Sequence, residues 1–185
     1  DELISIFKTT GNDNIFLATR NGMAICFNEN DARAVGRTAS GVKAIDLADG
    51  DYVVGAEPVR EDSKVLLVTD GGYGKCTDLT SFRIQHRGGK GLKAYKITEK
   101  TGNIIGISMV NDSEELIMVT SEGVVIRIRI KDIATTTGRI TQGVRLINLN
   151  DGVTVVSMDK ISAEDAVEEE SEENNTEVTT ETTEE

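Results

Sequence analysis

The sequence predicts an all-β protein of about three similar blades, each built from four short strands. One observation is a repeat: an apolar run, a threonine and a glycine turn recur, with the threonine at Thr19, Thr69 and Thr120. Another is the composition of each repeat, in which short β-branched runs alternate with glycine turns. Repeats of roughly 50 residues with four short strands are typical of propeller-like blades, and this pattern excludes helical repeats.

Each repeat has a predicted β-hairpin at its centre. The turns of the three hairpins end in Gly22, Gly72 and Gly123. Glycine turns between two apolar runs are a strong local signal for a hairpin. The two strands of each hairpin are expected at residues 15–19 and 23–27, 65–69 and 73–77, and 116–120 and 124–130.

A further short strand is predicted before each hairpin, and a long loop that ends in a basic strand is predicted after it. The preceding strands are expected at residues 3–7, 53–56 and 104–107. One more strand, at residues 153–158, begins a fourth repeat that has no hairpin. This trailing strand suggests strand exchange, in which one repeat supplies a strand to its neighbour's sheet and covers an edge that would invite aggregation.

The chain divides into a folded part and an acidic tail. Residues 1–161 are predicted to hold the blades, with repeats at about 1–50, 51–102 and 103–152 and the extra strand at 153–158. Residues 162–185 contain 11 acidic residues and no basic residue. This tail is predicted to be disordered, because it cannot bury enough apolar surface to offset its ordering entropy. It is either a solubilising terminus or an acidic mimic of DNA.

Of the net charge of −12, −11 lies in the tail. The other 161 residues hold 21 acidic and 20 basic side chains, so charge does not exclude binding to nucleic acid. No signal peptide or long apolar run is found, which predicts a cytoplasmic protein without a membrane segment. Cys26 and Cys76 form no CxxC pair, and with a single histidine no metal site, cofactor or catalytic constellation is predicted.

The stretch that combines the most glycines with basic residues is Gln85-His86-Arg87-Gly88-Gly89-Lys90-Gly91. Three glycines in four positions favour a loop whose backbone can approach another backbone closely. A tight cationic loop with exposed N–H groups is a plausible seat for a phosphodiester backbone, although a basic glycine turn without function fits the heptapeptide alone. The same loop recurs at residues 36–43 and 138–145, which favours function.

Equivalent positions of successive blades lie on one rim of a radial array, so the repeated cations predict a curved positive track for duplex DNA. A protein-interaction platform without nucleic acid is the alternative, but it has no need for a basic residue repeated after glycine. The candidate DNA-binding residues are Arg37, Lys43, Arg83, Gln85, His86, Arg87, Gly88, Gly89, Lys90, Gly91, Lys93, Lys96, Arg139 and Arg145.

The heptapeptide at residues 85–91 closely resembles the box Gln-Arg-Arg-Gly-Gly-(Arg/Lys)-Gly of the DNA gyrase A-type chain. The three repeats around it resemble the C-terminal β-pinwheel of that chain, over residues 1–161. The resemblance implies blades with exchanged strands and a rim that bends and wraps duplex DNA. It also implies that this region supports ATP-dependent negative supercoiling by a bacterial, nucleoid-associated type IIA topoisomerase.

The same resemblance implies that the chain is no enzyme on its own. The DNA-cleaving tyrosine belongs to the N-terminal part of the gyrase A protein, and ATP and Mg²⁺ act elsewhere in an A2B2 holoenzyme. The implied partners are duplex DNA, the rest of the gyrase A protein and the gyrase B protein.

Two departures from the family pattern stand out. His86 occupies a position where the box usually has arginine, which suggests a secondary copy of the box. The chain also holds about half of the six blades of the family's domain. The A-type chain of topoisomerase IV is a close relative with similar blades, but it usually lacks a good box, so the box favours gyrase.

Overall fold

The computed structural model describes residues 2–162, and this part of the chain is all-β. It contains three single-turn 3-10 helices, at Glu29–Asp31, Leu79–Ser81 and Ile130–Asp132, and no α-helix. The strands are β1 (Asn14–Thr19), β2 (Met23–Asn28), β3 (Val53–Pro58), β4 (Lys64–Thr69), β5 (Tyr73–Asp78), β6 (Leu92–Lys93), β7 (Ile104–Val110), β8 (Glu115–Thr120), β9 (Val125–Arg129), β10 (Thr135–Thr136), β11 (Val144–Arg145) and β12 (Val155–Ile161). No helix between residues 2 and 162 is long and apolar enough to cross a membrane.

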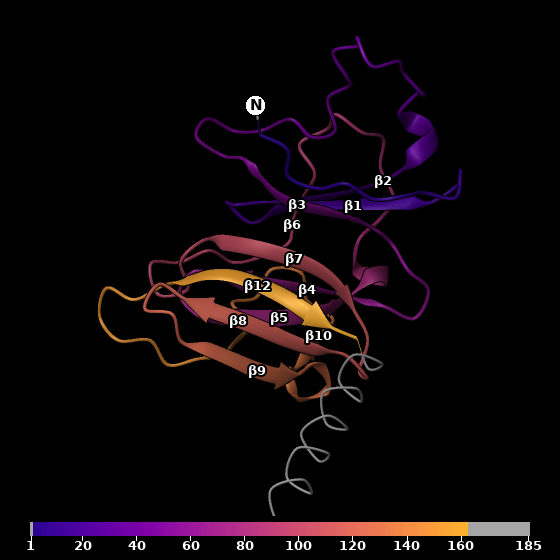
Figure 1. Cartoon of the computed structure of the whole chain (residues 1–185). Helices are drawn as coiled ribbons and strands as arrows, with labels where there is room; N and C mark the ends of the chain where they lie inside the picture. The colour runs from indigo at the N-terminus through magenta and orange to yellow at the C-terminus, as the bar shows by residue number, and fades with distance from the viewer. Residues whose placement is uncertain (1, 163–185) are drawn as a thin grey trace, which may run out of the picture.

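The strands form three blades, each centred on one of the predicted hairpins (Figure 1), and their named strands pair antiparallel except for β10, which runs parallel to β5. The first blade has the order β3-β1-β2-β6, and the second has the order β7-β4-β5-β10, with β11 also paired to β5. The third blade has the order β12-β8-β9. The predicted all-β fold of propeller-like blades is confirmed.

The first two blades take their inner and outer strands from the following repeat. Hairpin β1–β2 is flanked by β3 and β6, which come from the second repeat, and hairpin β4–β5 is flanked by β7, β10 and β11 from the third. Strand β12 extends the third blade by pairing with β8. The predicted strand exchange is therefore confirmed, and the exchange involves two strand positions where the sequence indicated one.

The recurring threonine has a structural cause that is the same in all three blades. The hydroxyl oxygens of Thr19, Thr69 and Thr120 accept hydrogen bonds, at 3.1–3.2 Å, from the backbone N–H four residues later. Each hydroxyl thereby closes the hairpin turn from inside, where all three threonines are buried. A buried hydroxyl needs such a partner, and the turn supplies it.

Two of the three hydrophobic clusters of the described residues lie between neighbouring blades, and the third covers the other face of the first blade. One cluster packs the first blade against the second and includes Phe16 and Phe82, whose rings meet edge to face at 4.8 Å. A second cluster, with Leu66 and Met118, packs the second blade against the third. Because a strand between two blades buries both faces, its sequence is a continuous apolar run with no polar alternation.

Residues 3–7 were expected to form a strand, and this expectation is wrong. The segment has no strand pairing, and Leu3 and Ile6 are about four-fifths exposed, at 78% and 81%. Strands β3, β7 and β12 each pair with the hairpin that precedes them in sequence. No hairpin precedes residues 3–7 within the described part of the chain, so they have nothing to pair with.

The repeat limits and the disorder of the acidic tail stay predictions. The limits at 50, 102 and 152 follow from turns in the sequence, whereas the blades combine strands from neighbouring repeats. The predicted disorder concerns residues 162–185, and all of these except Ser162 lie outside the described residues.

Candidate nucleic-acid interface

Three cationic loops follow the hairpins: the first loop is residues 36–43, the second loop residues 86–93 and the third loop residues 138–145. The second loop is seated on hairpin β1–β2. Gln85 N–H donates to the Cys26 carbonyl at 2.8 Å, and Ala94 N–H donates to the Gly22 carbonyl at 2.8 Å. Between these two bonds, β6 pairs with the start of β2.

Two of the three glycines in the second loop are required by its shape. Gly88 and Gly91 have φ of +80° and +72°, in the left-handed region that favours glycine. A Cβ at Gly91 would lie 2.4 Å from the Ala24 carbonyl oxygen, whereas one at Gly89 would meet nothing closer than 3.8 Å. Gly143 has the same role in the third loop, where a Cβ would lie 2.3 Å from the Gly74 carbonyl oxygen.

The second loop also binds the end of the first loop. Gly88 N–H donates to the Ala44 carbonyl at 2.6 Å, and Asp46 N–H donates to the Gly89 carbonyl at 2.9 Å. The Arg87 guanidinium donates through Nη1 to the Lys43 carbonyl at 3.0 Å and through Nε to the Asp31 carbonyl at 2.7 Å. Arg87 is half-buried, and its fork links two segments of the preceding repeat.

The third loop repeats this arrangement one blade further on. Arg139, which is equivalent to Arg87, donates through Nη1 to the Lys93 carbonyl at 3.3 Å. Lys96 N–H donates to the Thr141 carbonyl at 3.0 Å, and the Tyr95 hydroxyl donates to the Gln142 carbonyl at 2.5 Å. The three loops therefore form one continuous row, which we call the loop row, joined by hydrogen bonds from each loop to the next.

Most of the predicted cationic side chains on this row are exposed. Lys43 pairs with Asp46 at 3.0 Å, and His86 Nδ1 lies 3.1 Å from an Asp31 carboxylate oxygen. Gln85 is half-buried, and its amide nitrogen has no hydrogen-bond partner in the structure. Exposed side chains are those of Arg37, Lys43, Arg83, His86, Lys90, Lys93, Lys96 and Arg145, whereas Arg87 and Arg139 are half-buried.

An aromatic residue near the row, Tyr73, was not singled out as a site residue from the sequence. The Tyr73 hydroxyl accepts from Arg145 Nη2 at 2.9 Å, and this bond lowers the pKa of Tyr73. The Tyr73 ring also lies 5.5 Å from Lys100 Nζ, within the range of a cation–π contact. No local sequence signal joins Tyr73 to Arg145, because the two meet only through the pairing of β11 with β5.

The described residues offer no metal or thiol chemistry on this surface. No group of three or more His, Cys, Asp or Glu side chains between residues 2 and 162 could hold a metal ion. Burial raises the pKa of Cys76 to about 11 and also raises that of Cys26, so neither thiol readily forms the reactive thiolate.

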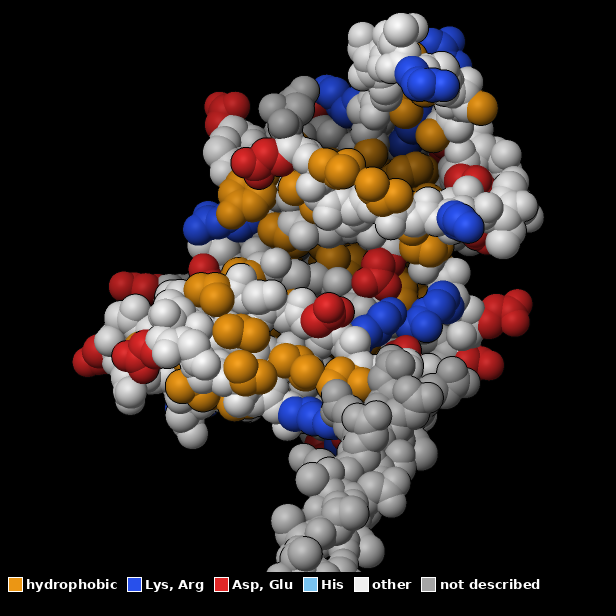
Figure 2. All heavy atoms as spheres, in the orientation of Figure 1, with side chains coloured by type: hydrophobic (Ala, Val, Ile, Leu, Met, Phe, Trp, Pro, Cys, Tyr) orange, Lys and Arg blue, Asp and Glu red, His pale blue; other side chains and the backbone are white. Residues whose placement is uncertain are grey.

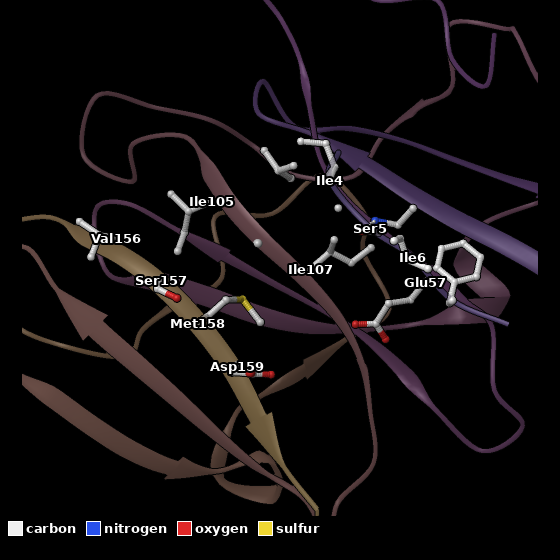
Figure 3. A pocket seen from close by; sticks show the side chains of 15 residues that line it. Ile4, Ser5, Ile6, Glu57, Ile105, Ile107, Val156, Ser157, Met158 and Asp159 are labelled. Atoms are coloured by element: carbon white, nitrogen blue, oxygen red, sulfur yellow. Dashed lines mark hydrogen bonds between the residues drawn. The ribbon is translucent and has the colours of Figure 1, made fainter. Parts of the chain in front are cut away.

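A groove of about 670 Å³ lies on a different side of the blades, along the inner strands. Figure 2 shows hydrophobic side chains gathered across the middle of this face. In Figure 3, Ile105 and Ile107 of β7, Val156 and Met158 of β12 and Ile4 of the first segment surround the space. Most of the exposed lining of the groove is polar despite these apolar side chains, and it includes the carboxylates of Glu57 and Asp159, so the groove does not suit a polyanion.

The fold and the loop row define a class of protein: a partial β-propeller with exchanged strands and a row of cationic loops. A family model described as the DNA gyrase C-terminal domain, beta-propeller, matches residues 13–60, 63–111 and 114–162. The chain belongs to this family, as the resemblance of residues 85–91 to the gyrase box predicted.

Relatives and solved structures agree with this assignment. The DNA gyrase A protein of Staphylococcus epidermidis is 46% identical over 167 residues, which cover 89% of this chain and 19% of that protein. The crystal structure of the C-terminal domain of DNA topoisomerase IV matches with a TM-score of 0.80 at 27% identity, over 91% of this chain and 53% of that one. The structure of a DNA gyrase A C-terminal domain matches with a TM-score of 0.75 at 26% identity, over 81% and 51%. The chain thus spans about a fifth of the curated relative that it matches.

Proposed function

We propose that the chain binds duplex DNA along the loop row and bends it around the blades. The observation that carries this proposal is the continuity of the row: three loops with the same cationic pattern are joined by hydrogen bonds and present six exposed cationic or imidazole side chains, with Arg83 and Lys96 exposed beside the second loop. Such an array is suited to reading the phosphate backbone and not the base sequence.

The energetics favour a cooperative row over a single loop. Each phosphate that a lysine or arginine neutralises releases counterions, which makes binding strong at low salt and steeply salt-dependent. Smooth bending of 20–30 base pairs costs roughly 1–6 kcal/mol, so contacts from several blades must act together. Hydrogen bonds between the loops keep those contacts on one curve, which is the condition for sharing this cost.

Within this proposal the chain is the DNA-wrapping part of the A protein of a bacterial DNA gyrase. It performs no chemistry itself: DNA cleavage belongs to the rest of the A protein, and ATP and Mg²⁺ act elsewhere in an A2B2 assembly with the gyrase B protein. The wrapped DNA supports ATP-dependent negative supercoiling at the nucleoid, in the cytoplasm. The 46% identity to a gyrase A protein supports this choice.

The A-type chain of a topoisomerase IV is the second candidate, because the C-terminal domain of that enzyme gives a TM-score of 0.80. The box at residues 85–91 favours gyrase, but His86 in place of an arginine weakens the box as a primary DNA site. The two candidates differ in the topology of their product. Gyrase introduces negative supercoils with ATP, so a holoenzyme that only relaxes or decatenates DNA would identify topoisomerase IV.

A topology assay on DNA circles tests the proposed wrapping directly. Nicked circles are ligated with the protein bound, and the linking number is read after the protein is removed. We expect a linking-number shift that grows with protein concentration and shrinks as salt rises. The control variant Lys8→Gln removes a cation outside the loop row and should keep the shift. Binding without any shift would contradict wrapping, and no binding at low salt would contradict DNA binding altogether.

A further inference from the structure

Lys75 is a cation that is fully buried in the second blade. Its exposed fraction is 0%, although lysine is almost never fully buried unless it is paired. The equivalent positions, six residues after the recurring threonine, are Ile25 and Ile126 in the other two hairpins. The other two repeats therefore place an apolar side chain at the position that the second repeat fills with a charge.

The Lys75 ammonium is satisfied by the third loop. Its Nζ donates to the Arg139 carbonyl at 2.5 Å, to the Gly138 carbonyl at 3.3 Å and to the Thr141 hydroxyl at 3.2 Å. Nζ also lies 5.3 Å from the centre of the Tyr95 ring. An ammonium has three donors, and all three are used on one loop. Tyr95 and Lys96 hold the Thr141–Gln142 half of that loop, so Lys75 is the anchor of its first half.

We propose that Lys75 is a positioning residue, which fastens residues 138–141 to the second blade and so holds Arg139 in the loop row. This inference rests on the proposed DNA binding, but its structural half concerns the loop alone. A buried charge normally costs stability, and an apolar side chain of similar size is often equal or better for folding. Lys75 is therefore better explained by loop positioning than by stability.

The protonation of Lys75 makes this anchor sensitive to pH. Burial lowers the pKa of Lys75 from 10.5 to about 8, with a smaller contribution from the charge of Arg139. If the loop opened, Lys75 would return to water and regain a pKa near 10.5, so the open loop binds more protons than the closed one and rising pH above 8 favours the closed loop. The other groups that face or neighbour Lys75 are Tyr95, whose pKa burial raises, and Tyr73, whose pKa Arg145 lowers.

The first test measures loop order by NMR relaxation in the Lys75→Ile variant, without DNA. Ile25 and Ile126 show that isoleucine suits this position in the fold. We expect backbone order parameters at residues 138–141 to fall from about 0.85 to below about 0.6, with the second loop unchanged as an internal reference. Rigid residues 138–141 in the folded variant would overturn the proposal. Thr141→Val, which removes one acceptor, is a milder second variant that should loosen the same residues.

The second test measures duplex affinity between pH 7 and pH 9. For the unmodified chain we expect affinity to rise by up to about tenfold, because release of the Lys75 proton favours the closed loop, which holds Arg139 in the loop row. Lys75→Ile should be about tenfold weaker at pH 7 and flat across this range, whereas Lys8→Gln should keep the pH dependence. A pH profile of Lys75→Ile that parallels the unmodified chain would overturn the proposal. An unmodified chain that binds no DNA would instead contradict the proposed function, and the relaxation test would still decide the role of Lys75.

Discussion

The three loops share one sequence pattern but are held in three different ways. The first loop sits on no hairpin within the described residues, and all of its residues are exposed. The second loop sits on a hairpin whose buried position is Ile25, and the third sits on one whose equivalent is Lys75. The pattern alone therefore does not determine the environment of a loop, because that environment depends on the hairpin of the preceding repeat, on which the loop sits.

The glycines show this difference most clearly. Gly41, Gly91 and Gly143 are equivalent and have φ of +75°, +72° and +68°. A Cβ would strike a backbone carbonyl at 2.4 Å or less at the last two, but would meet nothing within 4 Å at Gly41. The same glycine thus carries a conformational requirement in every loop and a packing requirement only where a hairpin lies beneath it.

The largest expected effect comes from a substitution that disrupts the packing of the second loop on its hairpin, compared with the same substitution in the first loop. Gly91→Ala should destabilise the chain by about 3 kcal/mol, because a methyl group would overlap the Ala24 carbonyl and the positive φ is strained. Gly41→Ala should cost only about 1 kcal/mol, from strain alone. Urea unfolding followed by circular dichroism measures both. Equal destabilisation of the two variants would show that the second loop is not seated as described.

The next prediction compares the pH dependence of stability with lysine and with isoleucine at the buried position under the third loop. Because the pKa of Lys75 is about 8 in the folded chain and near 10.5 when unfolded, the unfolded chain binds more protons between these values. The unfolding free energy of the unmodified chain should therefore rise from pH 8 to pH 10.5, by roughly 2–3 kcal/mol relative to Lys75→Ile. Both chains contain the same cysteines and tyrosines, so their difference isolates Lys75. Parallel pH curves for the two would refute this interpretation.

A third prediction compares DNA binding by the seated and the unseated loop. Arg87→Ala with Lys90→Ala should weaken duplex affinity by about tenfold, and Arg37→Ala with Lys43→Ala by only a few-fold, because the first loop sits on no hairpin within the described residues and is held mainly at its end. The dependence of log affinity on log salt should become shallower by roughly 0.9 for each phosphate that is no longer neutralised. Gel shifts at several salt concentrations measure both quantities. Unchanged binding by both double variants would rule out the loop row as the DNA site.

The smallest effect distinguishes a positioning arginine from a phosphate ligand. Arg87→Lys keeps the charge but cannot hold the carbonyls of Asp31 and Lys43 with one fork, so affinity should fall by about threefold. Lys90→Arg is the matched control, since Lys90 is exposed and either cation can meet a phosphate. If both exchanges leave fluorescence-anisotropy titrations unchanged, Arg87 contributes charge only.

Sequence reasoning reached the hairpins and the trailing strand because their signals are local. Glycine turns, a recurring threonine and apolar runs are enough to place β1–β2, β4–β5 and β8–β9. It failed at residues 3–7. This apolar run is as long as that of β3, but no partner strand is present for it within the described residues. Strand formation there depends on another segment, which the run itself does not report.

The sequence predicted which cations belong to the candidate site, but not which of them hold the loops in place. The cationic loops repeat visibly, so Lys90, Lys93 and Arg139 could be named from spacing. The sequence did not show that the guanidinium groups of Arg87 and Arg139 donate to backbone carbonyls, or that Lys75 lies under the third loop. These contacts join residues that are 44 to 64 positions apart in the sequence. Local patterns carry no information on contacts at such separations.

The exchange of strands β3 and β6 into the first blade has a consequence for how the chain folds during synthesis. Hairpin β1–β2 gains its inner partner at β3 and its outer partner only at β6, which ends at Lys93. A nascent blade therefore stays open-edged until almost the whole of the next repeat has left the ribosome. Non-local pairing of this kind is slow and leaves strand edges exposed meanwhile. Blade completion must lag elongation by one repeat, so a translational pause within the second repeat prolongs the exposure of the first blade.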